Sequence, residues 1–436
     1  MRKREKEFIL ILLLSAIIGM IVGAIVSLFH ISIDWVLLHK IEWLQNYWPW
    51  KEYLYIPYIL LTSCMVFISV YLVKHYSPEA AGSGIQEIEG VVANKRTMNE
   101  VRVIVVKFIG GLFSIGGGMA MGREGPSVQI GGAFGKLVSR KFHLRRDDIN
   151  VLIAAGAGAG LAATFNAPLA GLLFVFEEMR KEIRYTYIPV QSVLTATIMS
   201  VVILRLLVGN HISIPIEGLK IPSVEELWVF IVFGVFFGLL GFIFNKYLVF
   251  FTSALSTLNS FFSNIVTLII GAVIGALLYF YPESVGEGYS AITAGLNGNL
   301  GLSALLTLFA LRFLTTLLSY GTGAPGGIFA PMLALGTLFG LAFGLTIDDL
   351  FSTLDIQPML FAVVGMSALF SATVRAPITG IVLVAEMTSS FDLLMPLLIT
   401  SLFAVVTANA LGGRAIYTLL LERTLKISKF GSDKAF

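Results

Sequence analysis

Long apolar runs separated by short polar connections follow one another along almost the whole chain. An apolar run of about 20 residues is long enough to cross a bilayer as a helix. The first run covers residues 8–29 and the last covers 393–411, and a polar, basic tail at 412–436 follows. The pattern therefore predicts an all-α polytopic membrane protein that is surrounded by the lipid bilayer, with roughly a dozen or more helices, some of them short.

Between the first and last runs, glycine and proline mark where the expected helices break. The aromatic segment 41–53 is typical of a membrane interface. The expected helices are 56–76, 102–115, two within 150–180 that break at 166–168, 190–208, 225–251, 263–281, 302–319, a helix ending near 345, 357–374, 376–389 and 393–411.

Two blocks of the sequence recur in the same order. The first recurs 205 positions later and the second 209 positions later, each with a proline at a helix boundary. Paired Gly/Pro-interrupted segments in two halves indicate a transporter site near the bilayer midplane. We expect an N-terminal segment and first helix (1–50), two inverted repeats (51–210 and 211–411), and a pore-lining helix start with a cytoplasmic tail (412–436). The matching positions are Gly122, Pro126, Gly131, Phe134 and Gly135 with Gly327, Pro331, Gly336, Phe339 and Gly340, and Gly156, Ala163, Thr164, Ala167, Pro168, Gly171 and Glu177 with Gly365, Ala372, Thr373, Ala376, Pro377, Gly380 and Glu386.

The composition excludes several classes of function. Of 436 residues, 56% are hydrophobic and 13% are charged, and the mean hydropathy is +0.86. The net charge of +3 indicates no nucleic-acid partner. A single cysteine, Cys64, and five histidines without ligand spacing predict no metal site and no cofactor. The basic residues at 2–6 place the N-terminus in the cytoplasm.

The segment G-R-E-G-P-S-V-Q-I-G-G-A-F-G (122–135) has the features of a helix start inside apolar sequence. Pro126 suits a first helical turn, and the glycines allow close backbone approach. The free N–H groups and positive end of such a helix attract an anion, and Glu124 could compete for the same place. The matching position in the second block is Phe329. Two helix starts aimed at one place would form an anion site; alternatively, the glycines and prolines only mark tight turns.

Four motifs together resemble the CLC family of chloride channels and proton/chloride exchangers. They are G-S-G-I-Q (82–86), G-R-E-G-P (122–126), G-G-I-F-A-P (326–331) and the tyrosine of R-A-I-Y-T-L-L (414–420). The sequence looks closest to the short bacterial exchangers. This resemblance implies a homodimer with one pore per subunit in the inner membrane of a bacterium, with both termini cytoplasmic.

The resemblance also implies roles for individual residues. Glu124 would be the external gate and proton acceptor, and Glu178 the internal proton relay, close to the basic residues Arg180, Lys181 and Arg184. The anion-binding residues would be Ser83, Tyr417, Ile328, Phe329, Arg123 and Gly125.

Each of these roles has a simpler alternative. Glu124 could be a structural partner of Arg123, and Ser83 a helix N-cap. Tyr417 could be an interface aromatic, and Glu178 a surface carboxylate paired with a nearby cation. The sequence departs from the family pattern at Gln86, where proline is usual, which affects the expected anion affinity and selectivity more than the fold.

The function expected from the sequence is exchange of chloride for protons across the membrane. An uncoupled chloride channel on the same fold is the main alternative, and Glu178 argues against it. A fluoride exchanger fits less well, because Ser83, Tyr417 and Glu178 resemble the chloride branch. An intramembrane enzyme would need a metal cluster or a nucleophile–base pair, and the sequence offers neither.

Overall fold

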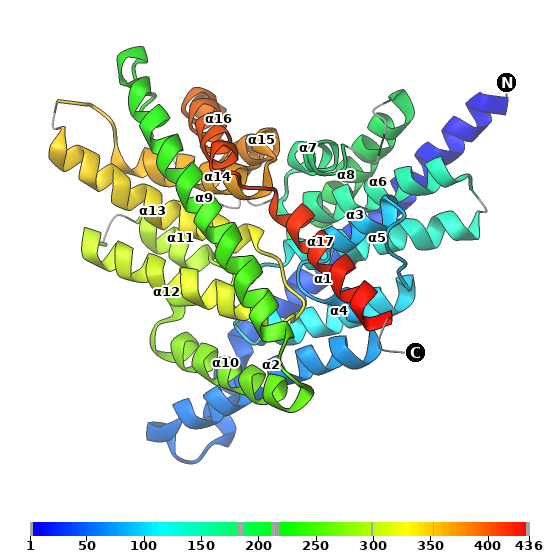
Figure 1. Cartoon of the computed structure of the whole chain (residues 1–436), viewed down its shortest axis with the longest axis horizontal. Coiled ribbons are helices and arrows are strands. Elements are labelled where there is room, and N and C mark those ends of the chain that lie inside the picture. Colours follow the sequence, from blue (N-terminus) through cyan, green and yellow to red (C-terminus); the bar gives the residue numbers. More distant parts are fainter. Residues whose placement is uncertain are drawn as a thin grey trace.

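The computed structural model describes residues 3–142, 144–180, 183, 186–210, 214, 216, 218–297, 300–351 and 353–432, with side chains between Lys6 and Lys426. These residues form 17 α-helices and five short 3-10 helices, with no strand among them (Figure 1). Nine of the described helices are long and apolar enough to cross a membrane. The expected all-α polytopic membrane fold is confirmed. The α-helices are α1 Lys3–Tyr47, α2 Tyr55–Tyr76, α3 Ile85–Val92, α4 Glu100–Ile115, α5 Glu124–Lys141, α6 Arg146–Phe165, α7 Pro168–Glu178, α8 Tyr187–Val208, α9 Leu227–Ser256, α10 Ser260–Phe280, α11 Tyr289–Leu296, α12 Leu302–Gly321, α13 Phe329–Leu350, α14 Pro358–Val374, α15 Pro377–Thr388, α16 Leu394–Ala410 and α17 Ile416–Ser432.

Equivalent helices make equivalent packing contacts in the two halves of the chain. Helix α1 packs on α6 and α8, and α9 packs on α14 and α16 in the same way. Helices α5 and α6 form one close pair, and α13 and α14 form the equivalent pair. The repeat limits expected from the sequence stay a prediction. We propose that the first repeat also includes α1, because α1 occupies the place that α9 occupies in the second half.

Equivalent helices also meet each other between the halves. Helix α2 packs against α10, and α7 packs against α15 (Figure 1). The α2–α10 contact is close because α10 has glycine on that face: a Cβ at Gly271 would lie 2.8 Å from the Cα of Ser63. Small residues of this kind let helix backbones approach within a membrane.

Glycines also bring α5 against α6 and α13 against α14. A Cβ at Gly131 would lie 2.1 Å from the carbonyl oxygen of Gly156, and one at Gly336 would lie 2.3 Å from that of Gly365. These four residues are mates in the sequence repeat. The near contact of the backbones fixes the direction of α5 and α13, which carry the candidate site at their N-terminal ends.

Several boundaries differ from those expected. Helix α1 continues through the aromatic segment to Tyr47, because nothing breaks it before Pro49, whose ring disfavours helical geometry in the preceding residue. The short helix α11, which lies before α12, was not expected, and α17 continues from the expected helix start in 412–436 to Ser432. The break within 150–180 is where the sequence places it: Asn166 ends α6 in the left-handed region (φ 55°), and Pro168 begins α7.

Candidate functional site

Helices α5 and α13 begin next to each other in the interior. Just before them, Gly122 and Gly327 exchange backbone hydrogen bonds: the N–H of Gly122 donates to the oxygen of Gly327 (2.9 Å), and the N–H of Gly327 donates back (2.6 Å). These glycines are also mates in the sequence repeat. Equivalent loops of the two halves therefore meet, and the positive ends of two helices come together.

The side chain of Glu124 fills the gap between these helix starts. It is the first residue of α5, is 1% exposed, and its Oε1 accepts the backbone N–H of Ala330 in the first turn of α13 at 2.8 Å. Its Oε2 has no hydrogen-bond partner among the described residues. A Cβ at Gly327 would lie 2.5 Å from that oxygen, so glycine is needed for the carboxylate to fit.

Backbone N–H groups supply the positive lining of this gap. Gly125 is the second residue of α5, and Ile328 and Phe329 begin α13; all three are buried. The first N–H groups of a helix have no partner within the helix, so they are available to a carboxylate or an anion. Ala330, which donates to Glu124, was not expected from the sequence, because a backbone donor has no side-chain signature.

Two buried hydroxyls, those of Ser83 and Tyr417, lie beside this region. Ser83 and Tyr417 are each 0% exposed, and Ser83 Oγ and Tyr417 Oη have no hydrogen-bond partner of acceptable geometry among the described residues. The two hydroxyls lie close enough to interact, and a Cβ at Gly125 would lie 2.4 Å from Ser83 Oγ. Buried, unpaired O–H groups beside free amides offer what a desolvated anion requires.

Phe329 forms the apolar wall beside the hydroxyls. Its ring centroid lies 6.1 Å from that of Tyr417 and 4.6 Å from that of Phe370. It also packs on Phe165 and Phe174, at 6.4 and 5.7 Å. Four aromatic rings therefore hold the Phe329 ring in place, and one of them is that of Tyr417.

The loop that carries Ser83 is held by residues that the sequence did not single out for this role. Tyr320 Oη accepts the backbone N–H of Ser83 at 3.3 Å. Buried Lys107 donates to the carbonyl oxygens of Ala80 (2.9 Å) and Gly82 (2.6 Å). Glu87, which pairs with Arg96 at 2.8 Å, also interacts electrostatically with Lys107. Lys107 stands within an apolar run, and this position was the sequence feature that could have indicated a buried role for its charge.

Arg123 directs its charge away from the gap. Its Nε donates to Oε1 of Glu287 at 2.6 Å, and its Nη2 donates to Oδ1 of Asp34 at 2.8 Å. Glu287 is buried between Gly286 and Gly288, both at positive φ, whereas the Asp34 side chain is 54% exposed. Neither acid was expected here. Glu287 also interacts electrostatically with Glu124, so this ionic cluster acts on the carboxylate of the gap.

Glu178 lies at the end of α7, half-buried, and interacts electrostatically with Tyr417. The neighbouring Glu177 turns to α15, where its carboxylate accepts the N–H groups of Ile378 and Thr379. Of the expected basic cluster, Arg180 is exposed, and Lys181 and Arg184 lie outside the described residues. Tyr417 thus interacts electrostatically with both Glu178 and Glu124, and Glu124 accepts the N–H of Ala330.

The chain belongs to the voltage-gated chloride channel family, because the sequence model of that family matches residues 65–409. The H(+)/Cl(-) exchange transporter ClcA of Vibrio campbellii is 46% identical over 426 residues, which cover 96% of this chain and 90% of that protein. The transporter of the same name from Vibrio cholerae is 45% identical over 433 residues, 98% of this chain and 92% of that protein. Among solved structures, a slow cyanobacterial Cl-/H+ antiporter aligns with a TM-score of 0.92 at 37% identity, covering 95% of this chain and 98% of the antiporter. The family expected from the four motifs is confirmed.

Proposed function

We propose that this protein is a secondary active transporter that exchanges chloride for protons across the membrane. The observation that supports this most directly is the position of Glu124, whose carboxylate accepts the N–H of Ala330 from the opposite half. A chloride ion would use the same helix-terminal donors. The ionised side chain and the anion therefore compete for one place.

Protonation decides the competition. The neutral acid loses its attraction to the helix ends and leaves the gap, and chloride takes its place. The anion is then coordinated by the N–H groups of Gly125, Ile328 and Phe329, and further in by the hydroxyls of Ser83 and Tyr417. When Glu124 loses its proton, it returns and displaces the anion. One carboxylate thereby links the movement of protons to that of chloride.

Glu178 supplies protons from the other end of the site. Its place at the end of α7, with an electrostatic interaction with Tyr417, supports a path from inner water past the hydroxyls to Glu124. An uncoupled channel would need no second carboxylate there. This observation, together with relatives named as exchangers, favours exchange over passive conduction. Arg123 contributes by holding Asp34 and Glu287 beside the gate rather than by touching the anion.

Reconstitution into liposomes tests the function. With chloride concentrated on one side, an exchanger pumps protons uphill until the chloride gradient is spent, and a pH electrode detects this movement. Chloride flux without uphill proton movement would establish the channel instead. A failure to move chloride at all would contradict both.

We further propose that the protein is a homodimer, with one pore per subunit, in the cytoplasmic membrane of a bacterium, both termini facing the cytoplasm. Helices α8 and α16 expose large aliphatic side chains suited to a subunit contact, including Leu206 (76%) and Leu402 (58%).

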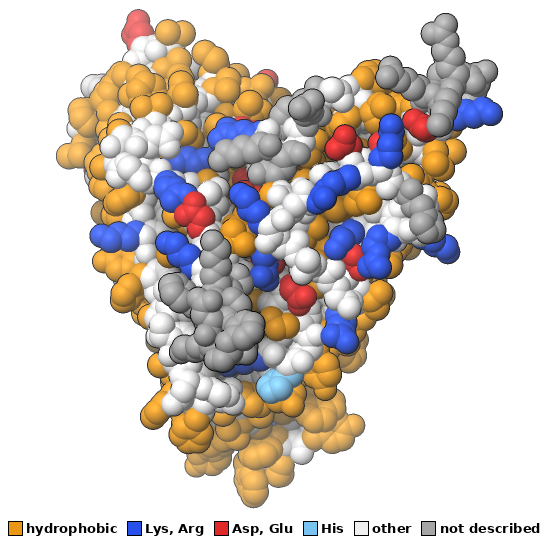
Figure 2. Space-filling view, turned by 45° about the vertical axis from the view of Figure 1, so that its right-hand side comes forward, with side chains coloured by type: hydrophobic (Ala, Val, Ile, Leu, Met, Phe, Trp, Pro, Cys, Tyr) orange, Lys and Arg blue, Asp and Glu red, His pale blue; other side chains and the backbone are white. Residues whose placement is uncertain are grey.

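Lysine and arginine side chains gather on the face shown in Figure 2, while the flanks are largely apolar. A basic face supports a cytoplasmic orientation. Cross-linking in membranes and accessibility of single cysteines test these two points.

A further inference from the structure

The stretch of sequence around Ser83 recurs around Glu287. The segment P-E-A-A-G-S-G (78–84) and the segment P-E-S-V-G-E-G (282–288) each begin with a 3-10 turn and lead into a short helix, α3 or α11. The offset of 204 positions pairs Ser83 with Glu287. Both residues lie between two glycines at positive φ, 59° and 83° in the first segment and 70° and 120° in the second. The two segments are therefore equivalent, and they are named the Ser83 loop and the Glu287 loop.

Each of these loops is hydrogen-bonded to the opposite half of the chain. In the Ser83 loop, the N–H of Gly82 donates to the carbonyl oxygen of Gly323 at 3.3 Å. In the Glu287 loop, the N–H of Gly286 donates to that of Gly118 at 3.0 Å. Gly323 precedes α13, and Gly118 precedes α5, which begins with Glu124. The Glu287 loop thus supports the approach to α5 as the Ser83 loop supports the approach to α13.

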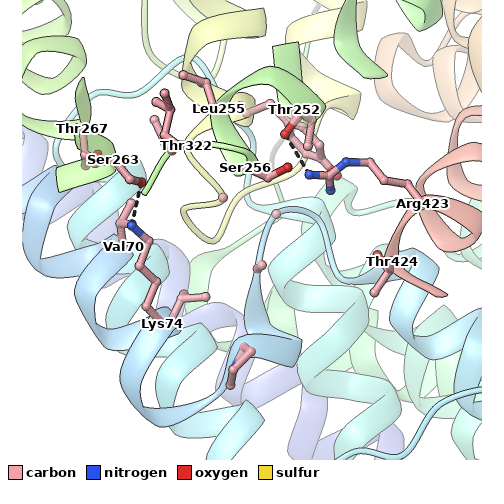
Figure 3. Close-up of a pocket in the computed structure, with 18 of the residues that line it drawn as sticks. Val70, Lys74, Thr252, Leu255, Ser256, Ser263, Thr267, Thr322, Arg423 and Thr424 are labelled. Carbon is pink, nitrogen blue, oxygen red and sulfur yellow. Dashed lines mark hydrogen bonds between the residues drawn. The ribbon is translucent and has the colours of Figure 1, made fainter. Parts of the chain in front are cut away.

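The two loops border different parts of the protein. The Ser83 loop borders a cavity of about 570 Å³ next to the proposed anion site, in whose wall Figure 3 shows Arg423 bonded to Thr252. The Glu287 loop, all of whose residues the structure describes, does not line that cavity. Its carboxylate instead accepts from Arg123 and interacts electrostatically with Glu124. The equivalent of the anion-binding hydroxyl is therefore an acid beside the gate.

Two side chains of α12, Arg312 and Thr315, bind the Glu287 loop. Arg312 is 0% exposed, and Thr315 follows it by one turn. Together they bind the carbonyl oxygens of four successive residues: Arg312 Nη1 donates to Glu283 (2.7 Å) and Val285 (2.7 Å), Arg312 Nη2 to Gly286 (3.0 Å), and Thr315 Oγ1 to Ser284 (2.9 Å). A planar guanidinium has several donors in fixed directions, which suits a row of carbonyl groups. Helix α12 therefore fixes the position of this loop.

Lys107 has the equivalent place in the first half. It lies 205 positions before Arg312 and binds the carbonyl oxygen of Gly82, as Arg312 binds that of Gly286. A buried cation is costly unless hydrogen bonds compensate for its lost hydration. In both halves that compensation comes from the carbonyl groups of the loop, so a buried cation holds each loop in place.

We propose that Arg312, together with Thr315, positions the ionic cluster of the gate by holding the Glu287 loop, so that the carboxylate of Glu287 stays on Arg123 and close to Glu124. If the loop moves, Glu287 repels Glu124 less and neutralises Arg123 less. Both changes favour the ionised form of Glu124. The effect on exchange rests on the proposed function, whereas the anchoring of the loop does not.

Several other groups act on the same cluster. The titratable and charged side chains that interact with Glu287 or Arg123 come from α1, the start of α5 and α11, and they are His30, Asp34, Glu124 and Tyr289. Helix α12 adds the charge of Arg312. Thr315 carries no charge, so its replacement changes the support of the loop without altering this set of charges.

The pH dependence of exchange in liposomes tests the positioning role. In Thr315→Val the loop loses one hydrogen bond, and we expect the pH of half-maximal exchange to move down, though by less than in Glu287→Gln. Arg312→Lys keeps the positive charge but offers fewer donors in fixed directions, and should move this pH further down than Thr315→Val does. An upward shift in either variant would overturn the proposal.

Thr316→Val is the matched control for Thr315→Val. Thr316 is the next residue of α12 and is 0% exposed, and its hydroxyl has no hydrogen-bond partner among the described residues. This variant should keep the wild-type pH profile. Equal profiles of the two valine variants would show that the hydrogen bond to the loop does not position Glu287.

Combining variants shows whether Arg312 acts through Glu287. Mutations that act through a shared partner are not additive. Arg312→Lys should therefore add no further shift once Glu287→Gln has removed the acid. A full additional shift in the double variant would overturn the positioning role.

Amide hydrogen exchange of the purified full chain tests the anchoring without transport. In Arg312→Lys the amide of Gly286, which donates to Gly118, should exchange about fivefold or more faster than in the wild type, because the loop opens more readily. Thr316→Val should leave this rate unchanged. An unchanged rate in Arg312→Lys would overturn the proposal. If the wild type does not couple chloride to protons but Gly286 still loses protection in Arg312→Lys, the proposed function fails and the anchoring stands.

Discussion

Glu177 and Glu386 each cap the helix that carries the other. The carboxylate of Glu177, on α7, accepts the N–H groups of Ile378 (3.1 Å) and Thr379 (2.6 Å) at the start of α15. Glu386, on α15, accepts those of Leu169 (3.2 Å) and Ala170 (2.8 Å) at the start of α7. Each carboxylate lies at the positive N-terminal end of the other helix and accepts its free N–H groups. The two helices therefore stabilise each other's first turns.

Removing one of these caps should therefore lower stability without removing the gate. For Glu386→Gln we expect a loss of about 1 kcal/mol in the free energy of unfolding, because a neutral amide replaces a charge at a helix N-terminus. Thermal unfolding in detergent measures the loss. Glu225→Gln, at an exposed position, is the control, and an unfolding temperature equal to that of the control would contradict the capping role.

Replacing the gate carboxylate by its neutral isostere should separate the two ions. In Glu124→Gln the side chain cannot carry a proton or compete as an anion, so uphill proton movement should fall to the background leak while chloride still moves. Proton and chloride fluxes are measured in the same liposomes. Proton pumping at the wild-type rate would show that another group carries the coupling.

The close approach of Gly125 to Ser83 predicts a strict requirement for glycine. In Gly125→Ala the new methyl group would lie 2.4 Å from Ser83 Oγ and 2.7 Å from the carbonyl oxygen of Ser83, so the backbone that carries the hydroxyl must move with it. We expect chloride affinity to fall about tenfold or more, which corresponds to ~1.4 kcal/mol. Isothermal titration with chloride measures this. Gly301→Ala, where no atom lies within 4 Å, should bind normally; an equal effect of both variants would show that the contact is unimportant.

Glu287 should tune the response of the gate to external pH. Its negative charge beside Glu124 disfavours the ionised gate, so its removal favours ionisation. In Glu287→Gln a lower external pH is then needed to protonate Glu124, and the pH of half-maximal exchange should move down by on the order of one unit.

Asp34→Asn provides the comparison for this prediction. The Asp34 side chain is 54% exposed and shares Arg123 with Glu287, so solvent screens it more and its removal should shift the profile less. A shift to higher pH in Glu287→Gln would contradict the repulsion on which the prediction depends.

The sequence predicted much of the fold because glycine and proline residues mark both the ends of helices and the matching positions of the repeat. Asn166 and Pro168 mark the end of one helix and the start of the next, and the sequence repeat pairs Gly122 with Gly327, which are in contact in the structure. The extension of α1 to Tyr47 was missed, because aromatic and polar residues at an interface are compatible with both a helix and a loop. Among these residues, only Pro49 indicates where α1 ends.

The site was predicted less completely. Residues with a characteristic side chain in a motif, such as Ser83, Glu124 and Tyr417, could be named, and the structure brings them into one region. Ala330 acts through its backbone. Glu287 is remote in sequence from Arg123, so no local pattern could connect them. Long-range ion pairs and backbone donors depend on tertiary packing, which a single sequence does not reveal.

The mutual hydrogen bonds of Gly122 and Gly327 have a consequence for biogenesis. The loop containing Gly122 leaves the ribosome some two hundred residues before Gly327, with which it exchanges backbone hydrogen bonds. These two hydrogen bonds can therefore form only after the second half has been made. A translation product interrupted before Gly327 lacks the start of α13 and cannot assemble this site.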